Sequence, residues 1–313
     1  EEIMPMTRDH FFTGQSVLDW TIPEEWNITD AYIITPNGEK IADFRTHNLH
    51  VMGYSEPIDA IMSLDELRPH LYSLPDTPEA IPYVTSYYKR NWGFCITHRQ
   101  FESLAEGNYR VVINSELKPG KMTIGQTILP GDSADEILLS SYLCHPSMGN
   151  HELGGPITLV YLYKLLKESG PHRHTFRFLL CPENIGATAF LSKYGDHLER
   201  HLVGGYVINC VAHGPIVTYK KSRRSNTAAD LAAINYLKYS GREFREIDFF
   251  PDGSDERQFC SPGFNFPIGL VMRKMYGTFA EYHTSLDNLD FFSAKTLQES
   301  ISIYIDILQT LDA

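Results

Sequence analysis

The feature that most constrains the fold is the alternation of strand-like and helix-like apolar runs from about residue 136 onward. Short apolar runs between turn signals predict buried strands, and longer segments with apolar residues three or four positions apart predict helices. Strands are predicted at residues 136–143, 175–181, 205–210 and 268–272, and helices at residues 156–169, 185–194, 227–240 and 294–311. This alternation is typical of an α/β fold with a mixed, mostly parallel sheet flanked by helices.

The first part of the chain is instead rich in short strands and turns. Pro36-Asn-Gly38, between two apolar runs, is a β-hairpin signal. Ser63 and Glu66 have the spacing of a capping box for a short helix, and the aromatic run 86–96 has strand-like composition. We therefore predict three parts: an N-terminal segment that packs on the main domain (1–29), a small β-rich domain (30–114) and the α/β domain (115–313).

Composition limits the classes of partner. The formal charge of −12 opposes binding to polyanions, and the one basic cluster, at residues 220–224, is short enough to be a solvated loop. No stretch approaches the roughly 18 consecutive apolar residues of a membrane helix, and residues 1–8 lack the pattern of a signal peptide. The five cysteines are widely spaced, as expected for reduced thiols. We expect a cytoplasmic protein that binds neither nucleic acid nor membrane.

Two histidines follow the first predicted strand of the α/β domain. His145 and His151 lie in the loop between the strand at 136–143 and the helix at 156–169. In open α/β sheets ligands bind beyond the carboxyl ends of the strands, and neutral imidazoles are good ligands for zinc. The loop therefore indicates a metal site. Taken alone, it is also compatible with two ordinary loop histidines.

Further polar residues follow later strands of the same domain. Glu183 follows the strand at 175–181, where a carboxylate could serve as a general base, although a glutamate also suits the start of a helix. His283 precedes the last helix and supplies a third imidazole. The polar loop 252–258, which contains Asp255 and Arg257, is suited to lining a pocket, and a plain acidic turn explains it equally well.

Together these segments resemble the zinc exopeptidase clan of aminopeptidases and glutaminyl cyclases. The resemblance is strongest to a bacterial aminopeptidase-like branch with a small β-rich domain, often associated with polysaccharide biosynthesis. It covers most of the chain and rests on the segments described above and on three others, at residues 17–28, 48–57 and 83–95. It implies a zinc-exopeptidase-like fold.

The resemblance also implies roles for individual residues. His145 and His283 match metal histidines, the latter within a His-Thr-Ser-x-Asp pattern, and Glu183 matches the general base. Position 151, an aspartate in the family, is histidine here, and asparagines occupy positions 184 and 209, where two-metal enzymes have carboxylates. A two-zinc site is therefore not expected. We predict one zinc ion held by His145, His151 and His283.

The predicted function is that of a mononuclear zinc hydrolase of an amide or peptide bond, with a metal-bound water as nucleophile and Glu183 as general base. Two alternatives stay open: non-hydrolytic acyl transfer or cyclisation in the manner of glutaminyl cyclase, and a binding module with a degenerate metal site. The expected partner is a small peptide or an amide-containing small molecule. Candidate substrate-binding residues are Asp255, Arg257, Tyr282 and Glu152, of which Glu152 could instead be a ligand. The oligomeric state is left open.

Overall fold

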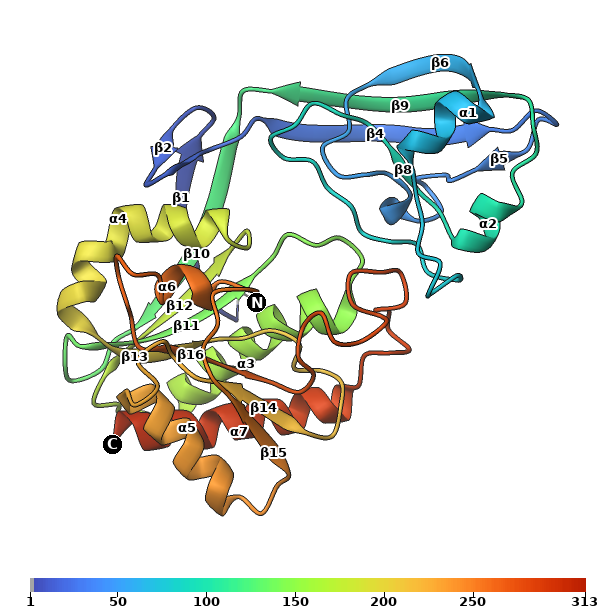
Figure 1. Cartoon of the computed structure of the whole chain (residues 1–313). Coiled ribbons are helices and arrows are strands. Elements are labelled where there is room, and N and C mark those ends of the chain that lie inside the picture. The colour runs from blue at the N-terminus through green and yellow to red at the C-terminus, as the bar shows by residue number, and fades with distance from the viewer. Residues whose placement is uncertain (1–2) are drawn as a thin grey trace.

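The computed structural model describes residues 3–313, which form a large α/β lobe and a smaller β-rich lobe (Figure 1). The large lobe is built on an eight-stranded sheet with the strand order β1-β10-β12-β11-β13-β16-β14-β15. Its strands are β1 (Thr7–Phe12), β10 (Lys121–Leu129), β11 (Glu136–Tyr142), β12 (Thr175–Cys181), β13 (Leu202–Val207), β14 (Val217–Lys220), β15 (Phe244–Ile247) and β16 (Ile268–Met272). The predicted mixed, mostly parallel sheet is therefore confirmed.

Most parallel pairings of this sheet lie at its centre, and β14 also pairs in parallel with β15 at one edge. At the centre β11 pairs with both β12 and β13, and β13 pairs with β16, all in parallel register. Antiparallel pairings connect β1 to β10, β10 to β12, and β14 to β16. Every residue of β11 and β16 is buried, which explains why these strands appear in the sequence as unbroken apolar runs rather than as alternating ones.

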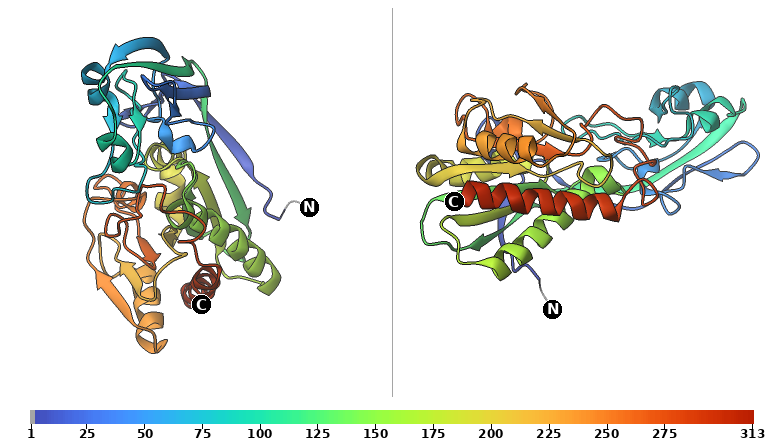
Figure 2. Two further views of the ribbon diagram at one scale, coloured as in Figure 1. Left: turned by 90° about the vertical axis from the view of Figure 1, so that its right-hand side faces the viewer. Right: turned by 90° about the horizontal axis from the view of Figure 1, so that it is seen from below.

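Helices cover both faces of the large sheet (Figure 2). On one face, α3 (Gly154–Ser169), α5 (Ala228–Tyr239) and α7 (Ala294–Asp312) share a hydrophobic core with the strands. On the other face, α4 (Ile185–His201) and the short α6 (Glu256–Phe259) contribute to a second core. The apolar stripe of α7, which includes Ile301 and Leu308, is buried in the first core.

The small lobe contains a four-stranded antiparallel sheet with the order β5-β4-β9-β6. Its elements are β4 (Glu25–Ile34), β5 (Lys40–Ile41), β6 (Ile58–Ser63), β7 (Leu71–Tyr72), β8 (Phe94–Cys95), β9 (Asn108–Lys118), α1 (Leu64–Leu67), α2 (His98–Glu102) and 3₁₀ turns at Asn48–His50 and Arg68–His70. The predicted hairpin joins β4 to β5, and Ser63 forms the predicted capping box with Glu66.

One local prediction for this lobe is wrong. Of the aromatic run 86–96, only residues 94 and 95 form a strand, and the segment before them is an irregular loop. Its tyrosines pack against other segments instead of continuing a sheet: Tyr87 lies against Tyr54, and Tyr88 against Trp20. Aromatic residues suit a strand only where neighbouring strands offer a surface for them, and here that surface belongs to other loops.

The two lobes are connected by long strands. In the small sheet β4 pairs with β9 from Glu25 opposite Lys118, so this sheet includes residues on either side of the range 30–114. The chain then turns at Pro119-Gly120 and enters β10 of the large sheet. The N-terminal strand β1 pairs with β10, and a small hairpin, β2 (Ser16–Val17) with β3 (Trp20–Thr21), precedes β4.

Within residues 3–313, no helix has both the length and the apolar character needed to cross a membrane.

Candidate metal centre

Three histidines meet beyond the carboxyl ends of the central strands. His145 lies in the loop after β11, His151 lies in a π-helical turn (Gly149–Leu153) that leads into α3, and His283 lies in the long loop after β16. One ring nitrogen of each lies within 4.8 Å of the corresponding nitrogen of the others. Because the carboxyl ends of parallel strands share one edge of the sheet, residues far apart in the sequence converge there.

The imidazoles have the orientation that a shared cation requires. The Nε2 atoms of His151 and His283 are 3.0 Å apart, and two nitrogens bound to one tetrahedral zinc ion would be about 3.3 Å apart. The opposite nitrogens of two rings have partners: Nδ1 of His145 is 2.9 Å from Oε2 of Glu152, and Nδ1 of His151 is 3.0 Å from the hydroxyl of Tyr142. Such contacts orient ligand histidines and leave Nε2 free to bind. The residues present therefore fit a single zinc ion.

The protonation of these groups supports the same assignment. Burial, together with the nearby His145, lowers the pKa of His151 well below its usual value and that of His283 to about 3, so both rings are neutral at physiological pH. Cys144, His145 and Glu152 form a second cluster of donor atoms. Burial raises the pKa of the Cys144 thiol well above its usual value, so this sulfur is protonated and is a poor ligand. The three histidines are thus the better donor set.

Asp287 holds the loop that carries His151. Its carboxylate accepts hydrogen bonds from the backbone N–H groups of Asn150 (2.7 Å) and His151 (2.8 Å), and its carbonyl accepts one from Gly149 (2.7 Å). Asp287 is fully buried, four residues after His283. One loop therefore supplies one histidine of the cluster, His283, and also fixes the position of another, His151.

Glu183 lies beside the cluster, at the turn between β12 and α4. Its Oε2 is 3.6 Å from Nε2 of His145. Burial, and then the nearby Asp255 carboxylate, raises the pKa of Glu183 well above its usual value, and burial raises that of Asp255 to about 7. The next residue, Asn184, has a strained backbone with φ of 60°, held by a 2.6 Å hydrogen bond from its N–H to Asp255. The turn thus keeps a carboxylate with a raised pKa next to the histidines.

The asparagines at the two family carboxylate positions have other partners. The side-chain oxygen of Asn184 accepts a hydrogen bond from Gln258 at 3.2 Å. The side-chain nitrogen of Asn209 donates to Ser254 at 2.9 Å, and its oxygen is buried without a partner within residues 3–313.

Three of the four predicted substrate-binding residues lie at or next to the cluster. The ring of Tyr282 stacks on His283 with centroids 4.0 Å apart, Glu152 contacts His145, and Asp255 binds the N–H of Asn184, the residue after Glu183. Arg257 does not join them, since its side chain lines a separate hollow with Arg223. Asp255 and Arg257 are close in sequence, but successive side chains around a helical turn point in different directions.

Sequence reasoning missed a residue from the small lobe. Tyr83 lies against the cluster, with its ring centroid 5.0 Å from that of His145 and 5.3 Å from that of His283. Its N–H donates to the carbonyl of His283 at 2.8 Å, next to an isolated bridge between Pro82 and Thr284. In the sequence, Tyr83 begins the run 83–95, which carries part of the family resemblance. Nothing in that run indicates that Tyr83 lies against the histidine cluster.

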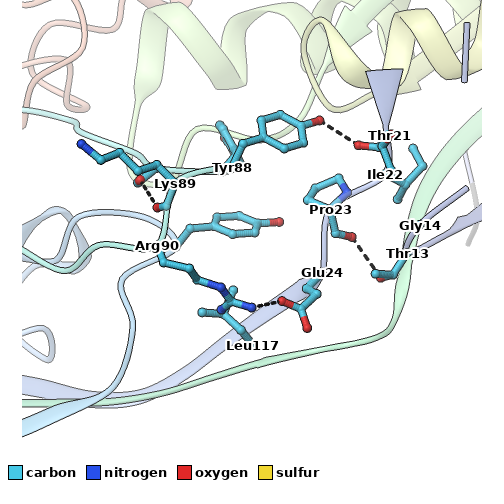
Figure 3. A pocket seen from close by; sticks show the side chains of 13 residues that line it. Thr13, Gly14, Thr21, Ile22, Pro23, Glu24, Tyr88, Lys89, Arg90 and Leu117 are labelled. Carbon is cyan, nitrogen blue, oxygen red and sulfur yellow. Dashed lines mark hydrogen bonds and ion pairs between the residues drawn. The ribbon is translucent and has the colours of Figure 1, made fainter. Parts of the chain in front are cut away.

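The same small-lobe segment also forms a hollow of about 290 Å³ where the lobes join (Figure 3). The hydroxyl of Tyr88 donates to the carbonyl of Thr21 at 3.0 Å, and Arg90 pairs with Glu24. Tyr87 lines this hollow, and its hydroxyl lies 3.3 Å from that of Tyr83. Two adjacent tyrosines therefore connect the hollow with the histidine cluster.

Fold and site together define an aminopeptidase-like protein. A zinc aminopeptidase from Bacillus subtilis has a similar structure, with a TM-score of 0.68 and 11% identity over 97% of this chain and 84% of that one. An aminopeptidase from Aneurinibacillus sp. strain AM-1 is also similar, with a TM-score of 0.59 and 12% identity over 98% of this chain and 84% of that one. At such low identity these likenesses establish the fold alone.

The chain belongs to the family described as a domain of unknown function (DUF4910), whose model matches residues 1–313. A Clostridium acetobutylicum protein is 42% identical over 99% of this chain and 70% of its own length. Its provisional name mentions polysaccharide biosynthesis and an aminopeptidase-like domain. A crystal structure from the same organism, provisionally described as a peptidase, has a TM-score of 0.95 and 41% identity, over 98% of this chain and 72% of that one.

Proposed function

We propose that this protein is a mononuclear zinc-dependent hydrolase of amide or peptide bonds, acting on small peptides or amide-containing small molecules. The observation that carries the proposal is the placement of Glu183 beside three convergent histidines, with Oε2 3.6 Å from Nε2 of His145. A zinc ion held by His145, His151 and His283 would polarise a substrate carbonyl and make water more acidic. The likeness to zinc aminopeptidases adds support from the fold.

Glu183 is the proton carrier in this proposal. A general base works best when its pKa lies near the working pH, and burial beside Asp255 raises the pKa of Glu183 in that direction. Glu183 takes a proton from the attacking water and passes it to the leaving nitrogen. Asp255 positions Glu183 because it binds the N–H of Asn184, the next residue in the turn.

The three neutral imidazoles set the charge of the site. Ligand carboxylates would offset part of the charge of a zinc ion, whereas His145, His151 and His283 do not. The site should therefore favour substrates that carry an anionic or strongly polarised group near the scissile bond. Tyr282 and Tyr83 border the cluster and restrict the space around that bond.

The test combines metal analysis with turnover in matched variants. The parent protein, purified with zinc present and then desalted, should retain one zinc ion per chain and hydrolyse a panel of aminoacyl and dipeptidyl anilides. Glu183→Gln should retain the same zinc content and lose about 10²- to 10⁴-fold in turnover, the usual contribution of a general acid–base group. Glu168→Gln, an exposed change on α3, serves as the control.

Each alternative outcome has a clear meaning. If Glu183→Gln lost its zinc, Glu183 would be a ligand and the proposed division of roles would be wrong. If zinc were bound at one per chain but no substrate in the panel were cleaved, hydrolysis would lose its support and acyl transfer would take its place. If the parent retained no stoichiometric zinc, a binding module with a degenerate site would replace the enzyme.

A further inference from the structure

A second hollow lies on the large lobe, separate from the histidine cluster. It has a volume of about 570 Å³ and is bordered by the segments that follow β14 and β15 and by α6. Its lining includes two arginines, one hydroxyl and several apolar side chains: Arg223, Arg257, Ser261, Phe249, Pro251 and Pro262. None of the three histidines, nor Glu183, lines it. The hollow is therefore a distinct feature of this lobe.

Neither guanidinium group in this hollow has a hydrogen-bond or ion-pair partner within residues 3–313. Many other arginines are paired: Arg45 with Asp30, Arg90 with Glu24, Arg99 with Glu79, Arg110 with Asp59, Arg177 with Glu136 and Arg273 with Glu299. Arg223 is exposed and Arg257 is half-buried, so both unpaired guanidinium groups can be reached from solvent at one hollow, in a chain whose formal charge is −12. A bound anion would give both of them a partner.

Acidic groups near the hollow do not serve as those partners. Glu256, next to Arg257, is fully buried and pairs with Lys220 at 2.8 Å. Asp248, next to Phe249, is exposed and pairs with Lys221 at 3.1 Å. No carboxylate is among the lining residues, so the charge that faces the hollow is positive.

The arginines stand on well-anchored backbone. Ser222, just before Arg223, donates its N–H and its hydroxyl to the buried carboxylate of Asp230, at 2.7 and 2.6 Å. On the other side, α6 is anchored by the buried pair of Glu256 and Lys220. A binding group on rigid backbone loses less entropy when its ligand arrives, so this arrangement is suited to recognition.

We propose that this hollow binds a small organic anion, with a phosphate or carboxylate group held by Arg223 and Arg257 and an apolar portion packed on Phe249. Guanidinium groups form paired hydrogen bonds with the oxygens of either anionic group, which makes two arginines a strong recognition element. Phe249 and the two prolines provide an apolar wall for the rest of the molecule. This proposal does not depend on whether the histidine cluster is catalytic, because the hollow and the cluster have no residue in common.

The experiment is isothermal titration calorimetry with defined probes on the whole chain. Phenyl phosphate and benzoate test the two anionic groups, inorganic phosphate lacks the apolar portion, and phenol lacks the charge. We expect saturable binding of phenyl phosphate or benzoate at one per chain. Inorganic phosphate should bind at least 10-fold more weakly than the better of the two, and phenol should not bind. The preferred probe identifies whether the natural anion is a phosphate or a carboxylate.

Variants connect the binding to the two arginines. Arg223→Gln and Arg257→Gln should each weaken the preferred probe at least 10-fold, and Arg257→Lys should weaken it less than Arg257→Gln because it retains the charge. Arg224→Gln is the matched control, since Arg224 is exposed like its neighbour Arg223 but does not line the hollow. A thermal unfolding transition measured for each variant serves as the check that the variant is folded.

The proposal is overturned if no anionic probe binds at millimolar concentration. It is also overturned if Arg224→Gln weakens binding as much as Arg223→Gln, because binding would then reflect general surface charge. Binding that survives both Arg223→Gln and Arg257→Gln would place the probe elsewhere, for example at the histidine cluster. Equal affinity for phenyl phosphate and phenol would show that the hollow recognises only an apolar ring.

Discussion

Replacing Glu152 by glutamine should weaken zinc binding, although in our assignment Glu152 is not itself a ligand. The Oε2 atom of Glu152 lies 2.9 Å from Nδ1 of His145, and its Oε1 accepts the N–H of Cys144. The side chains of His145 and Glu152 are only 6% and 4% exposed, so solvent does not screen their interaction. The carboxylate therefore fixes the ring orientation of His145 and makes it a stronger donor.

The size of the effect follows from what glutamine can retain. Its single carbonyl oxygen can accept from His145 or from Cys144 but not from both, and its NH₂ group would face the remaining N–H donor. The variant therefore keeps at most one of the two hydrogen bonds that Glu152 accepts, and that bond no longer involves a charged carboxylate. Changes of this kind typically cost 10- to 100-fold in metal affinity, or about 1.4–2.7 kcal/mol.

A competition titration against a chromogenic zinc chelator measures this change directly. The parent, Glu152→Gln and the exposed control Glu168→Gln are compared at the same pH, with thermal unfolding as a check on the fold. We expect Glu168→Gln to match the parent and Glu152→Gln to bind 10- to 100-fold more weakly. An affinity for Glu152→Gln within twofold of the parent would refute the reasoning, because it would show that the contact between Glu152 and His145 does not support a bound metal.

Three further predictions follow from the structure. His151→Ala removes one of the three proposed ligands, so metal analysis after purification with zinc should find the ion lost; retention at one per chain with the parent's affinity would exclude His151. Lys220→Met leaves Glu256 buried without its partner and should lower the free energy of unfolding by about 3–5 kcal/mol in urea titrations, whereas a loss below 1 kcal/mol would contradict this estimate. Burial alone would raise the pKa of Glu136, but hydrogen bonds and ion pairs with Arg177 and His197 lower it below its ordinary 4.5. The resulting stability is present above that pH and is lost as the pH falls, so the parent should lose more stability between pH 5 and pH 3 than Glu136→Gln, and equal losses would contradict the assignment.

Much of the large lobe could be predicted because its elements are long and strongly patterned. The strands at 175–181 and 268–272 have the predicted bounds, and the main helices differ from prediction mostly at their ends. The exception is α4, which continues to His201 although the predicted helix stops at residue 194. Gly195 follows the predicted end of this helix, and glycine weakens isolated helices. In the folded protein Gly195 packs against Phe264, and this tertiary contact compensates for the weak helix propensity.

The loop around residues 83–93 illustrates the opposite case. Its aromatic composition suggested a strand, and the structure instead places Tyr83 against His145 and His283 and directs Tyr87 and Tyr88 into the hollow between the lobes. The composition of the loop indicates only that its tyrosines prefer a partly buried surface. Which surface they receive depends on segments distant in the sequence, such as those that carry Trp20 and His283, and no local pattern contains that information.

The sequence by itself determined the α/β class, the central strands with the main helices, and the candidate residues for metal binding and proton transfer, because these depend on local periodicity and on side-chain type. It did not indicate the outer strands β1, β10, β14 and β15, and it placed β13 three residues too late. Only the tertiary structure decided which of those residues meet. It brought His145, His151 and His283 to one edge of the sheet, set Glu152 behind His145 and Glu183 beside it, and sent Arg257 to a separate hollow with Arg223. The physical reason is that distances between side chains in different loops are set by strand pairing and helix packing, which are long-range interactions that local sequence does not encode.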